Sequence, residues 1–329
     1  MTLPRRQFLC LAAGAAALAT VSQITGAQSY PTRPITLIVP FPAGAATDAI
    51  GRILGDSMRA SLGQPIVIEN VTGANGSIGV GRAARSINDG YTIAFGSWSN
   101  FIANGVAYTL PYNLLTDFEP IALLTKHPHV NVAKKIMPAD DLKGLIAWLK
   151  AYPDKATAGT NGVGSPQHVV AIFFQNKTGT RFGFVPYRGG APAFQDLLAG
   201  QIDLIFAPTG EAAALIRGGS IKVYAVMAQN RIAAAPDLPT VDEGGMPGLY
   251  MSTWFGLWAP AHPRKDVVAK LNTAAVEALA NPAVRARLAA IAQEIFPPDQ
   301  QTSEALGAFH KAGIEKWWPL LRAMNIKGE

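Results

Sequence analysis

Short apolar segments alternate with helix-like segments along almost the whole chain. Residues 35–39 form a mostly apolar run, and apolar side chains then recur at helical spacing over residues 50–62. The alternation continues with strands predicted at 66–68 and 91–95 and, between them, a glycine-rich loop over 73–79 that leads into a helix containing residues 82–87. Continuous apolar runs are typical of strands that are buried on both faces of a parallel sheet. The pattern therefore predicts an α/β fold.

The same order continues through the second half of the chain. Residues 121–124 and 130–133 look like two extended segments near a crossing point between structural units. Further strands are predicted at 156–160, 182–187, 203–206, 221–228 and 254–259, and helices at 141–150, 167–176, 191–198, 211–216, 267–279, 283–292 and 303–324. No linker rich in serine or proline separates two halves, so we expect interleaved domains.

Residues 1–27 have the features of an export signal. Arg5 and Arg6 precede an apolar stretch over residues 8–19, which is shorter than the ~20 residues that span a bilayer, and Thr25-Gly26-Ala27 offers small residues for cleavage. The arginine pair also fits a twin-arginine signal, with a Sec signal or a retained anchor as alternatives. We therefore expect a periplasmic protein that is cleaved near Ala27.

Removal of this segment changes the composition in a way that excludes several chemistries. It takes away Cys10, the only cysteine, so disulfides, cysteine metal sites and cysteine nucleophiles are excluded. It leaves 26 basic against 22 acidic residues, a net charge of +4, with no run of five basic residues. Nucleic-acid binding is therefore not expected, and no later run of 18 apolar residues predicts a membrane span.

Two loops of small residues follow predicted strands and precede predicted helices. In residues 40–48, small residues let the backbone approach a ligand, and Thr47 could cap the helix, whose amides would favour an anion. In residues 161–168, Ser165 is a good N-cap, Pro166 suits the first helical position, and His168 would lie in the first turn. Ordinary strand–helix connections and a packing histidine are the alternative interpretations.

Other motifs give weaker signals. Residues 79–84 match G-x-G-x-x-A, but the preceding strand ends about ten residues too early for a dinucleotide site. His127 and His129 share one face of a strand and could hold a metal, yet a structural role fits better without nearby acids. No P-loop, nucleophile elbow or H-E-x-x-H motif is present. The chain therefore resembles a binding protein more than an enzyme.

A series of motifs follows in order along the chain. They are Tyr30-Pro31-Thr32-Arg33-Pro34-Ile35, Val39-Pro40-Phe41-Pro42-Ala43-Gly44, Gly73-Ala74-Asn75-Gly76-Ser77-Ile78-Gly79, Gly164-Ser165-Pro166-Gln167-His168, Val185-Pro186-Tyr187-Arg188-Gly189-Gly190 and Trp254-Phe255-Gly256. With these motifs the chain resembles the periplasmic solute-binding receptors of tripartite tricarboxylate transporters, the Bug family. The resemblance covers residues 30–326, which is nearly all of the chain after the signal. Ala45 and Asn75 stand where the family usually has glycine.

The resemblance implies a type II periplasmic-binding-protein fold, with two doubly wound lobes, a hinge and a ligand cleft. Lobe 1 would comprise residues 28–131 and 254–329, and lobe 2 residues 132–253. The cleft would be lined by Phe41, Ala43, Gly44, Ala45, Thr47, Asp48, Gly76, Ser97, Asn100, Asn161, Gly164, Ser165, His168 and Arg188.

The resemblance also implies a function. The receptor would capture a small carboxylate (a dicarboxylate, tricarboxylate, aromatic acid or amino acid) and deliver it to the membrane permease subunits of a tripartite tricarboxylate-type transporter. It would act as a monomer without catalytic residues, metal or cofactor. The alternatives are a periplasmic hydrolase or transferase on a two-lobed α/β fold, and a ligand sensor for a signalling partner.

Overall fold

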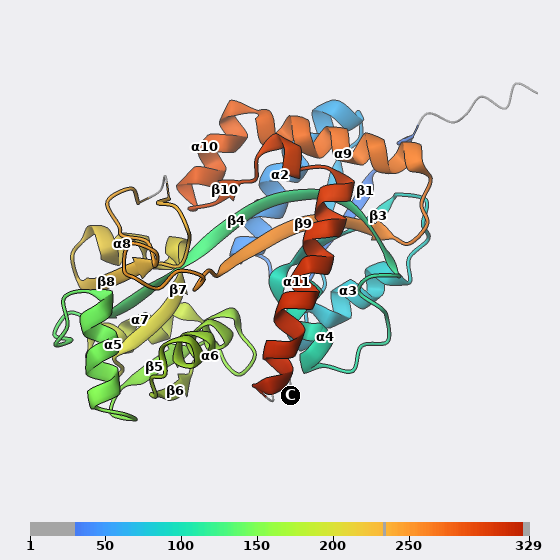
Figure 1. Ribbon diagram of the computed structural model, residues 1–329. Coiled ribbons are helices and arrows are strands. Elements are labelled where there is room, and N and C mark those ends of the chain that lie inside the picture. The colour runs from blue at the N-terminus through green and yellow to red at the C-terminus, as the bar shows by residue number, and fades with distance from the viewer. Residues whose placement is uncertain (1–29, 233–234, 325–329) are drawn as a thin grey trace, which may run out of the picture.

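The computed structural model describes residues 30–232 and 235–324, which form two lobes side by side (Figure 1). The predicted export signal, residues 1–27, lies outside the described residues. Within the described part of the chain, no helix combines the length and the apolarity that crossing a membrane requires.

Lobe 1 is built on a sheet with helices on both faces. Its strand order is β2 (Ile66–Asn70), β1 (Ile35–Val39), β3 (Thr92–Ser97), β9 (Ser252–Pro260), β4 (Phe118–Lys134) and β10 (Glu294–Ile295). The first three strands are parallel, and β9 runs antiparallel to both β3 and β4. One face packs on α2 (Ala46–Leu62), α9 (Lys265–Ala280) and α10 (Pro282–Ala290), and the other on α3 (Ser77–Ala84), α4 (Asn104–Ala107) and α11 (Ser303–Ala323).

Lobe 2 repeats this arrangement around the second half of β4. That half pairs with β7 (Leu204–Pro208) on one edge and β8 (Ile221–Val226) on the other, and β5 (Thr157–Thr160) and β6 (Gly183–Pro186) continue the sheet beyond β7. Its helices are α5 (Leu142–Ala151), α6 (Pro166–Thr178), α7 (Gly190–Leu198) and α8 (Thr209–Arg217). Three short helical segments are η1 (Ala74–Gly76), η2 (Ser99–Ala103) and η3 (Pro298–Gln300).

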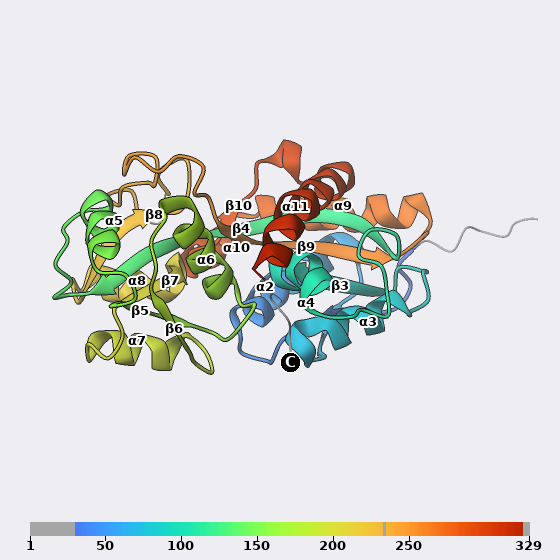
Figure 2. The same cartoon turned by 60° about the horizontal axis from the view of Figure 1, so that its bottom comes forward.

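The two lobes share β4, which corrects the prediction of two separate extended segments at 121–124 and 130–133. β4 is one strand of 17 residues that pairs with β9 in lobe 1 and with β7 and β8 in lobe 2 (Figures 1 and 2). Residues 251–254 form the second crossing, since Met251 bonds to His129 and Met227. The exact lobe boundaries at 131/132 and 253/254 stay a prediction.

The start of α3 is also corrected. The sequence predicts a loop over residues 73–79 and then a helix that contains residues 82–87, whereas α3 begins at Ser77 and ends at Ala84. A Cβ atom at Gly79 would lie 2.5 Å from the carbonyl oxygen of Val71 and 3.1 Å from Cα of Pro40. The glycine of the G-x-G-x-x-A match therefore serves close packing of α3 on the end of β1.

Candidate functional site

The carboxyl ends of the parallel strands of the two lobes face each other. β3 runs in the direction of β4, because both are antiparallel to β9, whereas β7 runs opposite to β4. β3 ends at Ser97, which pairs with Phe255 of β9, and Phe255 pairs in turn with Thr125 of β4. β7 ends at Pro208, which pairs with His129 of β4. The two levels are four residue-to-residue steps apart along β4, about 13 Å of strand. Loops that follow β1 and β5 therefore open toward a common space between the lobes.

The first loop, residues 40–45, leads into the N-terminus of α2. α2 begins at Ala46 with Ala45 as its N-cap and with no side-chain cap, so the prediction that Thr47 caps the helix is wrong. Among the hydrogen bonds within the described residues, the amides of Ala46, Thr47 and Asp48 have no acceptor. Helix N-termini with open amides attract anions. Phe41, Ala43 and Gly44 stay predicted as the residues around this position.

Asp48 fixes the shape of this loop from within. Its carboxylate accepts hydrogen bonds from the Gly44 amide at 2.9 Å, from Arg52 Nε at 2.9 Å and from Asn70 Nδ2 at 3.0 Å. Despite the desolvation by burial, which raises it, these bonds lower the pKa of Asp48 to about 2. Because both carboxylate oxygens are occupied, Asp48 holds Gly44 in its left-handed conformation (φ 82°) and positions the loop.

We expect Asp48→Asn to lower the free energy of unfolding by about 2 kcal/mol, because an amide loses the charge-assisted bonds and turns a donor toward other donors. Urea unfolding of the variant and wild type checks this. The control is Asp56→Asn on the same helix. Asp56 lies 3.9 Å from Arg287, its only cationic partner among the described residues, so this variant should lower the free energy of unfolding by no more than about 0.5 kcal/mol. Equal losses for the two variants would contradict the role of Asp48.

The second loop, residues 161–165, leads into α6 as predicted. Ser165 is the N-cap, its Oγ accepts the His168 amide at 3.3 Å, and Pro166 occupies the first turn. Nδ1 of His168 accepts the Gly164 amide at 3.2 Å, and burial lowers the pKa of His168. A neutral imidazole whose Nδ1 accepts carries its proton on Nε2. Nε2 of His168 is therefore a donor, and the backbone amide of Gln167 has no acceptor within the described part of the chain. Asn161, at the start of the loop, is half-buried.

Ser97, Asn100 and Gly76 come together at the end of β3. The Asn100 side-chain oxygen accepts the Ser97 amide at 2.7 Å, while its buried Nδ2 has no acceptor among the described residues. A Cβ at Gly76 would lie 3.2 Å from that Nδ2 and 3.0 Å from Cβ of Pro40. The structure thus places an unpaired amide donor beside the start of the first loop.

Two further charged side chains flank the start of α7 in lobe 2. Arg188 is exposed in the turn between β6 and α7 and has no carboxylate within 4.0 Å in the part of the chain that the structure describes. Glu211, in the first turn of α8, was missed by the sequence analysis. Its Oε2 would lie 2.5 Å from a Cβ at Gly190, the first residue of α7, and desolvation raises its pKa. Its position right after the end of β7 was the available signal.

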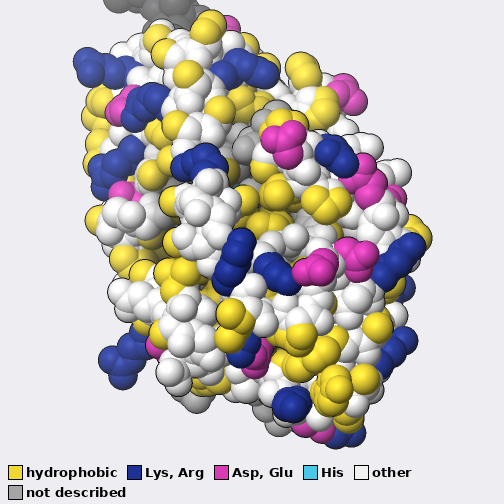
Figure 3. Space-filling view, turned by 90° about the vertical axis from the view of Figure 1, so that its left-hand side faces the viewer, with side chains coloured by type: hydrophobic (Ala, Val, Ile, Leu, Met, Phe, Trp, Pro, Cys, Tyr) yellow, Lys and Arg dark blue, Asp and Glu magenta, His cyan; other side chains and the backbone are white. Residues whose placement is uncertain are grey.

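The groups that follow these strand ends are mostly hydrogen-bond donors. Open amides, His168 and Asn100 all present N–H groups, and such a set suits carboxylate oxygens. The described residues contain no group of three or more histidine, cysteine or acidic side chains placed to hold a metal. Charges of both signs are scattered over the end of lobe 2, without an extended basic field on that face (Figure 3).

Comparison with known proteins identifies the family. Residues 50–326 match the family described as "Tripartite tricarboxylate transporter family receptor". BugT of Bordetella pertussis is 34% identical over 94% of this chain and 95% of its own. These matches confirm the resemblance found in the sequence.

Solved structures confirm the fold. MatC from Rhodopseudomonas palustris, with bound malate, is 32% identical, covers 89% of this chain and 100% of its own, and has a TM-score of 0.76. Rpa4515 of R. palustris, with adipate, is 29% identical, covers 90% of this chain and 99% of its own, and has a TM-score of 0.78. The chain belongs to the tripartite tricarboxylate transporter receptor family, the Bug family of periplasmic solute-binding proteins.

Proposed function

We propose that this protein captures a small dicarboxylate between its lobes and presents it to the permease subunits of a tripartite tricarboxylate-type transporter. The observation that carries the proposal is the pair of helix N-termini, α2 and α6, that follow strands whose carboxyl ends face each other. Each N-terminus carries about half a positive charge and can hold one carboxylate. The malate and adipate in two family structures are both dicarboxylates, which supports this choice.

Capture would involve movement of the lobes. The lobes are joined at the middle of β4 and at the crossing over residues 251–254. Rotation of the lobes about the two crossings would bring the loops onto the ligand. Glu211 would then add an acceptor for a hydroxyl or ammonium group on the ligand. No step of this cycle changes the ligand covalently, so the proposed role is binding without catalysis.

A thermal-shift screen of organic acids tests the proposal. At about 100 times its dissociation constant, the correct acid should stabilise the fold by about 2.7 kcal/mol. Its diamide should bind at least tenfold more weakly, because it lacks the charges that the helix N-termini attract. Mass spectrometry of the released ligand should return it unchanged. Equal affinity for acid and diamide would contradict the proposal.

Two substitutions in the second loop locate the site. Ser165→Ala should weaken binding about fivefold, which corresponds to about 1 kcal/mol for a lost hydrogen bond. Gly164→Val should weaken it more, because Gly164 has φ 78° and its loop must approach the ligand. Gly200→Val is the matched control, since Gly200 has a similar φ of 75° with open space around it and follows α7. Equal losses of affinity for the two valine variants would place the ligand elsewhere.

A further inference from the structure

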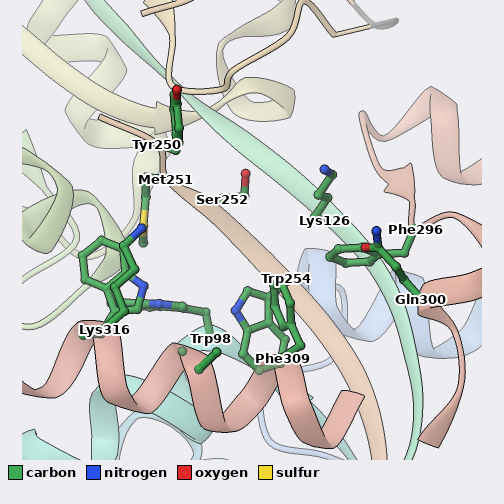
Figure 4. Close-up of a pocket in the computed structure, with 13 residues that line it drawn as sticks. Trp98, Lys126, Tyr250, Met251, Ser252, Trp254, Phe296, Gln300, Phe309 and Lys316 are labelled. Atoms are coloured by element: carbon green, nitrogen blue, oxygen red, sulfur yellow. The ribbon is translucent and has the colours of Figure 1, made fainter. Parts of the chain in front are cut away.

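A pocket separate from the two loops lies where α11 passes the start of β9. It has a volume of about 380 Å³ and is bounded by α11, by Trp254 of β9 and by residues 250–252 (Figure 4). Sites for small organic ligands have volumes of about 300–1,000 Å³. No residue of loops 40–48 or 161–168 lines this pocket. It is therefore distinct from the site proposed for the transported solute.

Aromatic rings form much of its wall. Trp254 meets Phe309 edge to face, with ring centroids 5.3 Å apart, and Trp98 meets Trp317 in the same way at 5.4 Å. Phe309 is 37% exposed, so solvent reaches this apolar lining. Trp98, Trp254 and Trp317 are 5% exposed or less, so a ligand would pack against them and would remove chiefly the surface of Phe309 from water, at about 25 cal/mol per Å². The wall therefore favours a flat apolar ligand.

Two lysines give the pocket its charge. Lys126 and Lys316 stand on different sides of the pocket in Figure 4, and each ammonium lies over a ring, at 5.3 Å from Phe296 and 5.0 Å from Trp317. Within the described residues, neither ammonium has a carboxylate within 4.0 Å, and no acidic residue lines the pocket. Partial burial and the nearby Lys177 of α6 lower the pKa of Lys316. Glu294 of β10, opposite Lys126 in the sheet, offsets part of the charge of Lys126, so Lys316 carries the less compensated charge.

We propose that this pocket is a second binding site, which takes a flat apolar anion of the aromatic carboxylate class. The rings of the ligand would stack on the aromatic wall, and its carboxylate would pair with Lys126 or Lys316. A small, strongly hydrated diacid would gain little from such a wall. The two sites therefore select different chemistry, and occupancy of one does not require the other.

Calorimetric titration with 2-naphthoate tests the proposal on the whole protein. We expect one equivalent to bind, and the double variant Lys126→Met/Lys316→Met to bind it at least tenfold more weakly. Lys265→Met/Lys270→Met, two exposed lysines on α9, is the matched control and should bind as wild type does. Far-ultraviolet circular dichroism checks that all variants are folded. Failure of 2-naphthoate to bind, or equal losses in both double variants, would overturn the proposal.

Two further titrations locate the probe and test the charge requirement. Gly164→Val should leave 2-naphthoate binding unchanged, whereas a loss there would show that the probe enters the space between the lobes and would overturn the proposal. Neutral 2-naphthamide should bind at least tenfold more weakly than 2-naphthoate. Equal binding of the two would show that the lysines have no role, and would also overturn it.

Discussion

Trp258→Ala is expected to lower the free energy of unfolding by about 3–5 kcal/mol, the range for removing a fully buried large aromatic side chain. Trp258 is 0% exposed, and its ring stacks on Phe101 with centroids 3.8 Å apart. A Cβ at Gly96 would lie 2.4 Å from this ring, and one at Gly256 2.8 Å from it, so the backbone of two strands is closely packed around the indole. These strands cannot collapse into the space that alanine would leave.

Denaturant unfolding, with the slope against denaturant concentration fitted for each variant, measures this loss. Trp148→Ala is the control, because Trp148 is a half-buried tryptophan on α5 that packs on Tyr152. Its loss should be no more than about 2 kcal/mol. Trp258→Phe should recover part of the stability, since a six-membered ring still stacks on Phe101. A loss at Trp258 no larger than that at Trp148 would refute the packing argument.

On acidification from pH 7.5 to 5.5, His127, His129 and His310 are expected together to lower the free energy of unfolding by roughly 4 kcal/mol, at about 1.4 kcal/mol per histidine per pH unit below 6.5. Burial lowers the pKa of His127, and the nearby His129 lowers it further. Burial also lowers the pKa of His129, and it lowers the pKa of His310 to about 4. The unfolded chain therefore binds more protons than the folded one. Stability is complete above the ordinary value of 6.5 and is lost as the pH falls toward the folded values.

A single substitution isolates the histidine contribution. His310→Gln should reduce the loss of unfolding free energy between pH 7.5 and 5.5 by about 1.4 kcal/mol, while His262→Gln, at an exposed position, should leave it unchanged. Glu211 and Glu294 have raised pKa values and act in the opposite direction, but this contribution is common to wild type and variants and cancels in the comparison. Identical pH profiles for His310→Gln and wild type would contradict the prediction.

Local chemistry made the second loop predictable from sequence. Ser165, Pro166 and His168 act within one helical turn, and each occupies its predicted position because caps depend on neighbours in the chain. The first loop was less predictable, because α2 starts with no side-chain cap and its geometry depends on Asp48 with the distant Asn70. The lining of the cleft as a whole stays a prediction from the family resemblance.

β4 shows why long-range features were missed. Thr125, His127 and His129 are polar and buried at the crossing, and Pro128 interrupts them, so the sequence indicated a break. Their partners lie far away in sequence: Gln293 bonds to Thr125 at 3.0 Å and to His127 at 2.8 Å, and Thr253 lies 3.1 Å from His129. Such partners cannot be found from local periodicity.

The position of β9 has a consequence for the order of folding. β9 lies between β3 and β4 in the sheet of lobe 1, yet residues 252–260 are synthesised after all strands of lobe 2, which end at residue 226. The chain can therefore complete the sheet of lobe 2 while β3 and the first half of β4 still have unpaired edges, which are open to wrong pairing. Insertion of β9 closes both edges at once. Because it joins segments more than 150 residues apart, this insertion is expected to be the slow step of folding.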